Sequence, residues 1–181
     1  LIERDDAQKV AAEVSVACRP DLLSIVAEAD IRGRICQDLQ KVLDNIEQNQ
    51  VTWTVMVPTM IAMMLNHPEF RPERLESLEV LTYGASPMPT ALLEKLLDMF
   101  PDLRIFQGYG MTEASAVLTV LGPEEHRAGG GLLKSAGRPV PGISLSIQDA
   151  EGKILPQGES GEVCARAGNL MREYWNKPEA T

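Results

Sequence analysis

Between residues 38 and 107, strand-like and helix-like stretches alternate, and this alternation restricts the possible folds more than any other feature. The apolar residues that open this region recur every three to four positions, as on one face of a helix. The next apolar stretch is rich in β-branched residues, which favour a strand, and Pro58 can open the helix after it. Strands that alternate with helices are joined by right-handed crossovers, so the sequence predicts an α/β unit with a parallel sheet and flanking helices. The expected helices lie at 38–49, 58–65 and 91–100, and the expected strands at 51–57, 78–83 and 103–107.

The pattern changes beyond Ser115, where short β-rich segments are separated by glycine and proline. Such punctuation is typical of antiparallel strands joined by turns. The sequence therefore predicts a small antiparallel β-barrel-like portion after the α/β unit, with strands at 117–121, 144–148 and 162–166. The expected division of the chain is a segment of mixed helical character at 1–36, an α/β part at 37–121 and an antiparallel β part at 122–181.

The composition excludes some classes of function. The formal net charge is −9, whereas proteins that bind nucleic acid present many Lys and Arg side chains to the phosphates. We therefore expect no nucleic-acid partner, although backbone amides and a metal ion can still hold a small anion such as ATP. The three cysteines show neither zinc nor disulfide spacing, and no apolar run is long enough to span a bilayer. We expect a cytoplasmic protein without a transmembrane segment, in which His67 and His126 have structural or surface roles.

Two loops that follow expected strands carry the candidate site. In open parallel sheets, ligands bind beyond the carboxyl ends of the strands, and consecutive parallel strands are usually neighbours. Both loops should therefore meet at one edge of the sheet. The first loop, 83–88, contains Gly84, Ala85 and Ser86, whose small size lets a flat ligand approach the backbone.

The second loop, 107–113, combines three kinds of chemistry within five residues. The ring of Tyr109 could stack on a base, the hydroxyl of Thr112 could bind a phosphate, and the carboxylate of Glu113 could hold Mg²⁺. From the residues alone, a glycine-rich turn with a buried tyrosine and a threonine at a helix start is the commoner explanation.

The stretch Gln107-Gly108-Tyr109-Gly110-Met111-Thr112-Glu113 resembles the adenine- and phosphate-binding motif of the adenylate-forming superfamily. That superfamily includes acyl-CoA synthetases, firefly luciferase and peptide-synthetase adenylation domains. The resemblance extends from about residue 38 to the end of the chain, and several motifs in the expected order are far more specific than one. The supporting stretches are Tyr83-Gly84-Ala85-Ser86-Pro87-Met88, Gly137-Arg138-Pro139-Val140-Pro141-Gly142, and 158–163 continuing to Met171 and Tyr174-Trp175-Asn176.

The resemblance implies a role for each matching residue. One face of an adenine ring would lie on the first loop, and Tyr109 would stack on the other face. Thr112 would contact the α-phosphate and Glu113 would bind Mg²⁺, which makes these two the expected catalytic residues. The other residues expected to contact the nucleotide are Gly84, Ala85, Ser86, Gln107, Gly108, Gly110 and Met111.

The implied reaction joins a small carboxylic acid, of the fatty or aryl type, to a thiol. The carboxylate attacks ATP to give acyl-AMP and pyrophosphate, and coenzyme A then forms the thioester, so ATP, Mg²⁺ and coenzyme A are the expected cofactors. Residue 1 is Leu rather than Met, and no lysine-containing phosphate loop or ribose-binding segment appears, so we expect a central fragment that is inactive alone. The alternatives are an amino-acid adenylation domain of a peptide synthetase and a non-catalytic fragment.

Other matches to the superfamily are expected to have structural roles. Gly137, Arg138 and Pro139, together with residues 159–162, should shape the antiparallel barrel. Trp175 should lie in the core.

Overall fold

The computed structural model describes residues 29–180, and describes side chains from residue 38 onward. The prediction for residues 1–28 lies outside the described residues. Helix α3, Ala29–Gln48, begins inside the segment for which only mixed helical character was expected. It extends the predicted helix at 38–49 toward the N-terminus by about two turns.

The central sheet of the described residues has five strands in the order β1-β2-β3-β4-β5. The first three are parallel, as the alternation of helices and strands predicts, whereas β4 and β5 are antiparallel to their neighbours. The register pairs Tyr83 with Gln107 and Gly84 with Gly108, so β2 and β3 end side by side. The strands are β1 (Trp53–Met56), β2 (Val80–Gly84), β3 (Arg104–Tyr109), β4 (Thr119–Leu121) and β5 (Arg138–Pro139).

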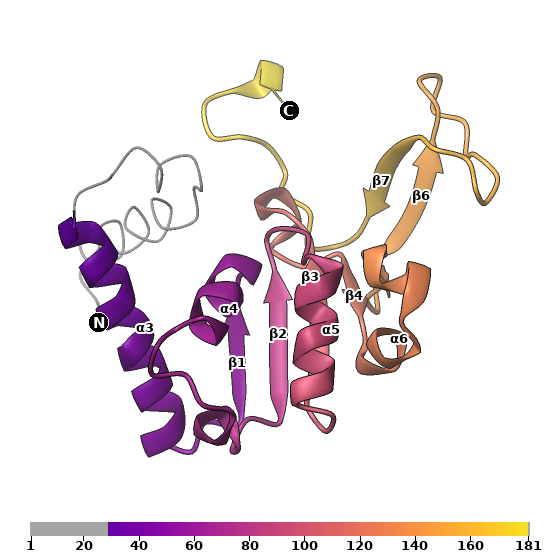
Figure 1. Ribbon diagram of the computed structural model, residues 1–181. Helices are drawn as coiled ribbons and strands as arrows, with labels where there is room; N and C mark the ends of the chain where they lie inside the picture. Colours follow the sequence, from indigo (N-terminus) through magenta and orange to yellow (C-terminus); the bar gives the residue numbers. More distant parts are fainter. Residues whose placement is uncertain (1–28, 181) are drawn as a thin grey trace.

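Helices α4 (Pro58–Leu65) and α5 (Thr90–Met99) connect the parallel strands and cover one face of the sheet, with α3 along its edge (Figure 1). Apolar residues at helical spacing lie on one face of each helix, and this face packs inward because its apolar surface is removed from water there. Each fully buried leucine or isoleucine contributes about 1.5–3 kcal/mol relative to exposure. The completely buried members of this core include Leu43, Ile61, Leu81, Leu93 and Ile105.

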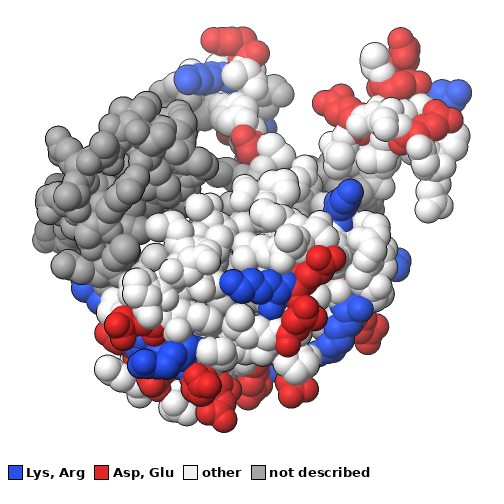
Figure 2. Space-filling view, in the orientation of Figure 1, with Lys and Arg blue, Asp and Glu red and all other residues white. Residues whose placement is uncertain are grey.

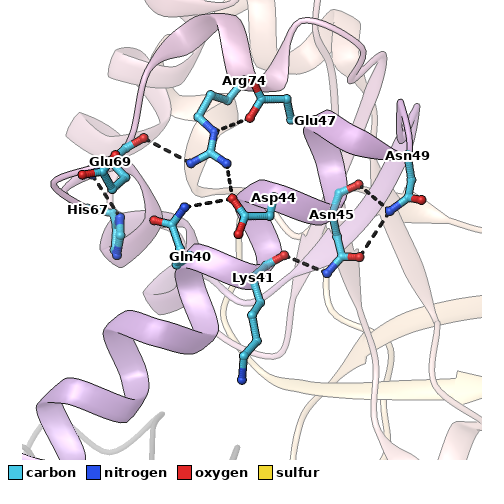
Figure 3. Close-up of polar contacts among 9 residues, drawn as sticks. All are labelled: Gln40, Lys41, Asp44, Asn45, Glu47, Asn49, His67, Glu69 and Arg74. Atoms are coloured by element: carbon cyan, nitrogen blue, oxygen red, sulfur yellow. Dashed lines mark hydrogen bonds and ion pairs between the residues drawn. The ribbon is translucent and has the colours of Figure 1, made fainter.

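Arg74 ties the loop before β2 to helix α3. It lies in the short 3-10 helix η1 (Pro72–Leu75), is only 6% exposed, and forms ion pairs with Asp44 and Glu47 of α3 (Figure 3). Gln40 also donates to Asp44, with 2.8 Å between the nitrogen and the oxygen. The hydrogen bond from Arg74 holds the pKa of the Asp44 carboxyl below its usual value. This cluster lies near the amino-terminal ends of the strands, away from their carboxyl ends, and has a structural role.

A short helix α6 (Pro123–Ala128) and the 3-10 helix η3 (Gly130–Lys134) follow β4 and pack on the first sheet. The chain then returns as β5, which pairs with β4. Arg138 and Pro139 therefore belong to the central sheet and not to the small barrel, which corrects the prediction. The expected boundary after residue 121 falls inside this sheet. β4 lies before the boundary and β5 after it, and the two strands are paired.

The small antiparallel portion is confirmed as a hairpin of β6 (Ser144–Gln148) and β7 (Glu162–Arg166), which projects from the α/β unit (Figure 1). A turn forms at 149–152 after β6, with a hydrogen bond from the Gly152 amide to the Asp149 carbonyl. Trp175 is 88% exposed, so its predicted place in the core is wrong for the described residues. Of the helices in the described part, none combines the length and the hydropathy needed to cross a membrane.

Candidate functional site

A cavity of about 380 Å³ opens at the carboxyl ends of β2 and β3. Both loops singled out in the sequence reach it, because the parallel pairing of these strands brings their ends to one edge. Of the predicted nucleotide-binding residues, Ala85, Ser86, Gln107, Gly108, Tyr109 and Gly110 line it.

The first loop begins where the two strands approach most closely. A Cβ on Gly84 would lie 2.7 Å from the carbonyl oxygen of Gly108, which no side chain could occupy. Ala85 follows with a φ of 65°, a left-handed conformation that costs a non-glycine residue about 1–2 kcal/mol. Such strain concentrates at functional sites because the surrounding structure must sustain it. The loop thus presents an exposed backbone at Ala85 and Ser86 to the cavity.

The second loop turns sharply back on itself after Tyr109. The turn is closed by a 2.8 Å hydrogen bond from the amide of Leu118 to the carbonyl of Tyr109. A Cβ on Gly110 would lie only 1.8 Å from the carbonyl oxygen of Ala116, so glycine alone permits this turn. The ring of Tyr109 is 41% exposed and lines the cavity, which leaves an aromatic face available to a ligand.

The last three predicted site residues lie beyond the cavity lining. Met111 and Thr112 are exposed, and Glu113 is half-buried in the 3-10 helix η2 (Thr112–Ala114). Glu113 accepts a 2.5 Å hydrogen bond from the hydroxyl of Tyr174. This bond, followed by one from its own backbone amide, lowers the pKa of the Glu113 carboxyl. The structure therefore brings six of the predicted residues to one cavity and places these three beside it.

Glu113 suits a magnesium site in which the protein supplies few ligands and the substrate supplies others. No group of three or more His, Cys, Asp or Glu side chains that could hold a metal occurs within the described residues. Mg²⁺ needs no such cage, because it is commonly bound by one or two carboxylates, substrate phosphates and water. A carboxylate has about four lone-pair positions, so the hydrogen bond from Tyr174 leaves room for a metal on Glu113.

Three lining residues were missed in the sequence. Leu133, Lys134 and Ala136 come from η3 and the residues after it, and complete the wall of the cavity. Leu133 is buried in the main core and anchors this wall, whereas Lys134 is exposed and brings a positive charge. No local pattern could reveal them, since they reach the cavity only because η3 folds back on the sheet. Lys134 can neutralise part of the charge of an anionic ligand.

A buried polar group supports the cavity from beneath. The Tyr83 hydroxyl lies 3.2 Å from Oε1 of Gln107 and 3.1 Å from Nε2 of His126. Nδ1 of His126 is 2.6 Å from the carbonyl of Gly122, which can only accept, so Nδ1 carries the proton and Nε2 is an acceptor. The single hydroxyl proton of Tyr83 therefore faces two acceptors, Nε2 of His126 and Oε1 of Gln107. Burial raises the pKa of Tyr83 to about 12 and lowers that of His126. The predicted structural role of His126 agrees with its complete burial.

The charged side chains are unevenly distributed over the face shown in Figure 2. They gather on the lower half of this face, on the hairpin at the upper right and on the segment at the top, and the upper middle of the face is largely uncharged. An excess of acidic over basic residues, 26 against 17, is no obstacle to an anionic ligand held by backbone and by one lysine.

Comparison with known proteins identifies the chain. The family model described as AMP-binding enzyme matches residues 31–175. A feruloyl-CoA synthase from Amycolatopsis sp is 36% identical over 94% of this chain and 33% of its own length. The fatty acid–[acyl-carrier-protein] ligase ScoC from Streptomyces coeruleorubidus is 37% identical over 78% of this chain and 27% of its own length. The chain thus spans about a third or less of the length of these two relatives.

Solved structures agree with the sequence comparisons. The amide bond synthetase McbA from Marinactinospora thermotolerans superposes with a TM-score of 0.71 and 33% identity, over 79% of this chain and 28% of that chain. The o-succinylbenzoate coenzyme A synthetase MenE from Bacillus subtilis, in complex with ATP and magnesium, gives a TM-score of 0.67 and 31% identity over 78% and 28%. The fold, the ordered motifs and the family match together show that this chain belongs to the family of AMP-binding, adenylate-forming enzymes.

Proposed function

We propose that this chain is the adenylate-binding part of an AMP-forming acid–CoA ligase that activates a fatty or aryl carboxylic acid. The observation that carries the proposal is the convergence of two motif loops on one 380 Å³ cavity that presents an aromatic face. The names of the relatives, which include a feruloyl-CoA synthase and a medium/long-chain-fatty-acid–CoA ligase from Mycobacterium tuberculosis, support an acid substrate and a thiol acceptor. A cytoplasmic location remains a prediction, as does the absence of a nucleic-acid partner.

Each cavity residue has a defined task in this proposal. The exposed backbone at Ala85 and Ser86 forms a platform for one face of adenine, and Tyr109 stacks on the other face. The close pairing of Gly84 with Gly108 keeps side chains out of the platform. The backbone of residues 107–111 positions the ring of Tyr109. Lys134 faces the anionic part of the ligand. These separate tasks explain why small residues follow one strand and an aromatic ring lies at the end of its neighbour.

Thr112 and Glu113 lie next to the cavity, where the phosphates would leave it. An oxygen of the substrate carboxylate attacks the α-phosphorus of ATP, the bond to the β,γ-diphosphate breaks, and pyrophosphate departs with the bonding electron pair. The Thr112 hydroxyl donates to the α-phosphate as charge shifts to its oxygens, and Glu113 holds Mg²⁺. The metal, when bound, neutralises phosphate charge. Catalysis by these residues consists of positioning and charge stabilisation.

A second thiol acceptor is supported by one relative. ScoC is named as a ligase that uses an acyl carrier protein, and it is 37% identical to this chain. The acceptor of this protein could accordingly be a carrier-protein thiol in place of coenzyme A. Both acceptors attack the same acyl-adenylate, so the two readings share the first half-reaction and differ only in the second.

The proposal is tested by the exchange of labelled pyrophosphate into ATP, driven by a fatty or aryl acid, in the ligase that contains this chain. Glu113→Gln is expected to slow the exchange by at least ~100-fold, because a charge-stabilising group is removed from the transition state. Glu94→Gln removes an exposed carboxylate of α5 that does not line the cavity, and serves as the control. Exchange by Glu113→Gln at the control rate would remove Glu113 from the site. Product formation with coenzyme A or with a carrier protein then separates the two acceptors.

A further inference from the structure

The chain that follows β7 returns to the metal-binding loop proposed above (Figure 1). We call residues 169–174 the clasp. Nδ2 of Asn169 donates to the carbonyl of Ala114 at 2.6 Å, and the Ser115 hydroxyl donates to the carbonyl of Asn169 at 2.8 Å. The amide of Met171 donates to the carbonyl of Glu113 at 2.7 Å. The clasp is thereby anchored to Glu113 and to the two residues that follow it.

The clasp also reaches the Glu113 carboxylate itself. The Tyr174 hydroxyl donates to Oε1 of Glu113 across 61 positions of sequence. Met171 and Tyr174 are 37% and 38% exposed, so the clasp is partly buried as well as hydrogen-bonded. Of these four hydrogen bonds, that of Tyr174 is the one that ends on a charged side chain.

We propose that Tyr174 is a positioning residue that orients the Glu113 carboxylate for the metal–nucleotide complex; this inference rests on the proposed function. A carboxylate on an exposed 3-10 turn can rotate among several staggered conformations. A hydrogen bond to one of its oxygens selects one conformation and directs the remaining lone pairs toward the metal. Partners of this kind typically change metal affinity by about 10–100-fold when they are removed.

The backbone of the same loop explains why it needs an external partner. Ser115 and Ala116 have φ values of 51° and 92°, which only the surrounding structure can sustain in residues other than glycine. The hydrogen bond from the Ser115 hydroxyl to the Asn169 carbonyl holds one of these residues directly. The clasp therefore keeps the strained turn closed as well as fixing the side chain of Glu113.

The first test detects the contact without nucleotide. In the ligase that contains this chain, labelled with ¹³C at tyrosine Cζ, the signal of Tyr174 is the one that Tyr174→Phe removes. Glu113→Gln is expected to shift this signal, because a charged acceptor is replaced by a neutral one. Glu173→Gln, the adjacent carboxylate in the clasp, is the matched control and should leave the signal in place. An unchanged signal in Glu113→Gln would overturn the proposal.

The second test measures binding of Mn²⁺, in place of Mg²⁺, in the presence of ATP, by the electron paramagnetic resonance signal of free Mn²⁺. Tyr174→Phe is expected to weaken Mn²⁺ binding by about tenfold. The same change in a Glu113→Gln background should have no further effect, since Tyr174 acts only through Glu113. Trp175→Phe should bind as the wild type does.

The outcomes separate this inference from the proposed function. Mn²⁺ binding that depends on Glu113 but is unchanged in Tyr174→Phe overturns the positioning role and leaves the proposed function in place. An equal loss in both backgrounds shows a structural effect of Tyr174 and also overturns the positioning role. Binding that is unaffected by Glu113→Gln refutes the metal role of Glu113 and the positioning role of Tyr174, whereas acid-dependent pyrophosphate exchange tests the ligase function separately.

Discussion

Replacing Gly110 by alanine tests the geometry of the site most directly. The new Cβ would lie 1.8 Å from the carbonyl oxygen of Ala116, whereas real Cβ atoms do not approach closer than 3.0 Å. The two backbone segments must therefore separate by at least 1.2 Å, the difference between these distances. No side-chain rotation can relieve the clash, because the obstructing atoms belong to the backbone.

The expected loss in the free energy of unfolding follows from the hydrogen bonds that close this turn. The amide of Leu118 donates to Tyr109 at 2.8 Å, and the amide of Ala116 donates to Met111 at 3.2 Å. Losing two such bonds costs about 2 kcal/mol at about 1 kcal/mol each. Strain in the opened turn adds to this cost, while the less flexible unfolded state offsets about 0.4–1 kcal/mol. We expect Gly110→Ala to lower the free energy of unfolding by about 2 kcal/mol.

Gly108→Ala, two residues earlier and near the end of β3, provides the control for stability. A Cβ on Gly108 would meet only a methyl group of Val117 at 3.9 Å, an ordinary contact. We expect it to change stability by less than about 0.5 kcal/mol. Urea unfolding of residues 1–181, followed by circular dichroism, measures the stability of both variants. Equal unfolding midpoints for the two variants would refute the close approach of Gly110 to Ala116.

Further predictions concern the stacking residue, the buried histidine and the chain itself. Tyr109→Ala should weaken ATP binding by about 1–3 kcal/mol and Tyr109→Phe only slightly, because stacking uses the ring face; large and equal losses in calorimetry would indicate a hydroxyl contact instead. Burial lowers the pKa of His126 in the folded protein, so the unfolded state binds more protons and stability should fall as the pH drops below about 6.5. This loss should be smaller in His126→Gln, measured by thermal unfolding between pH 8 and pH 5, and parallel curves would show that His126 does not cause it. Residues 1–181 alone should show no acid-dependent pyrophosphate exchange, because the cavity supplies the adenine platform without the further groups that the triphosphate and ribose need; exchange above that of Glu113→Gln would contradict this.

The main strands and helices could be predicted because their signals are local. A helix needs apolar residues every three to four positions, as in the segment that contains Leu39 and Leu43, and both residues are buried. The parallel order of β1, β2 and β3 follows from the alternation of strands and helices, since a crossover helix allows little else. The two motif loops could be placed at one edge for the same reason.

Tertiary structure alone decided the contacts between distant segments. Pairing of β5 with β4 depends on how η3 folds back, which also carries Lys134 to the cavity. The Tyr83–His126 contact spans 43 positions of sequence and the Tyr174–Glu113 contact spans 61. Local periodicity cannot encode such pairs, because they depend on strand register and loop closure in three dimensions. The exposure of Trp175 has the same origin: its hydrophobicity favours burial, but the path of the clasp over the loop leaves it in solvent.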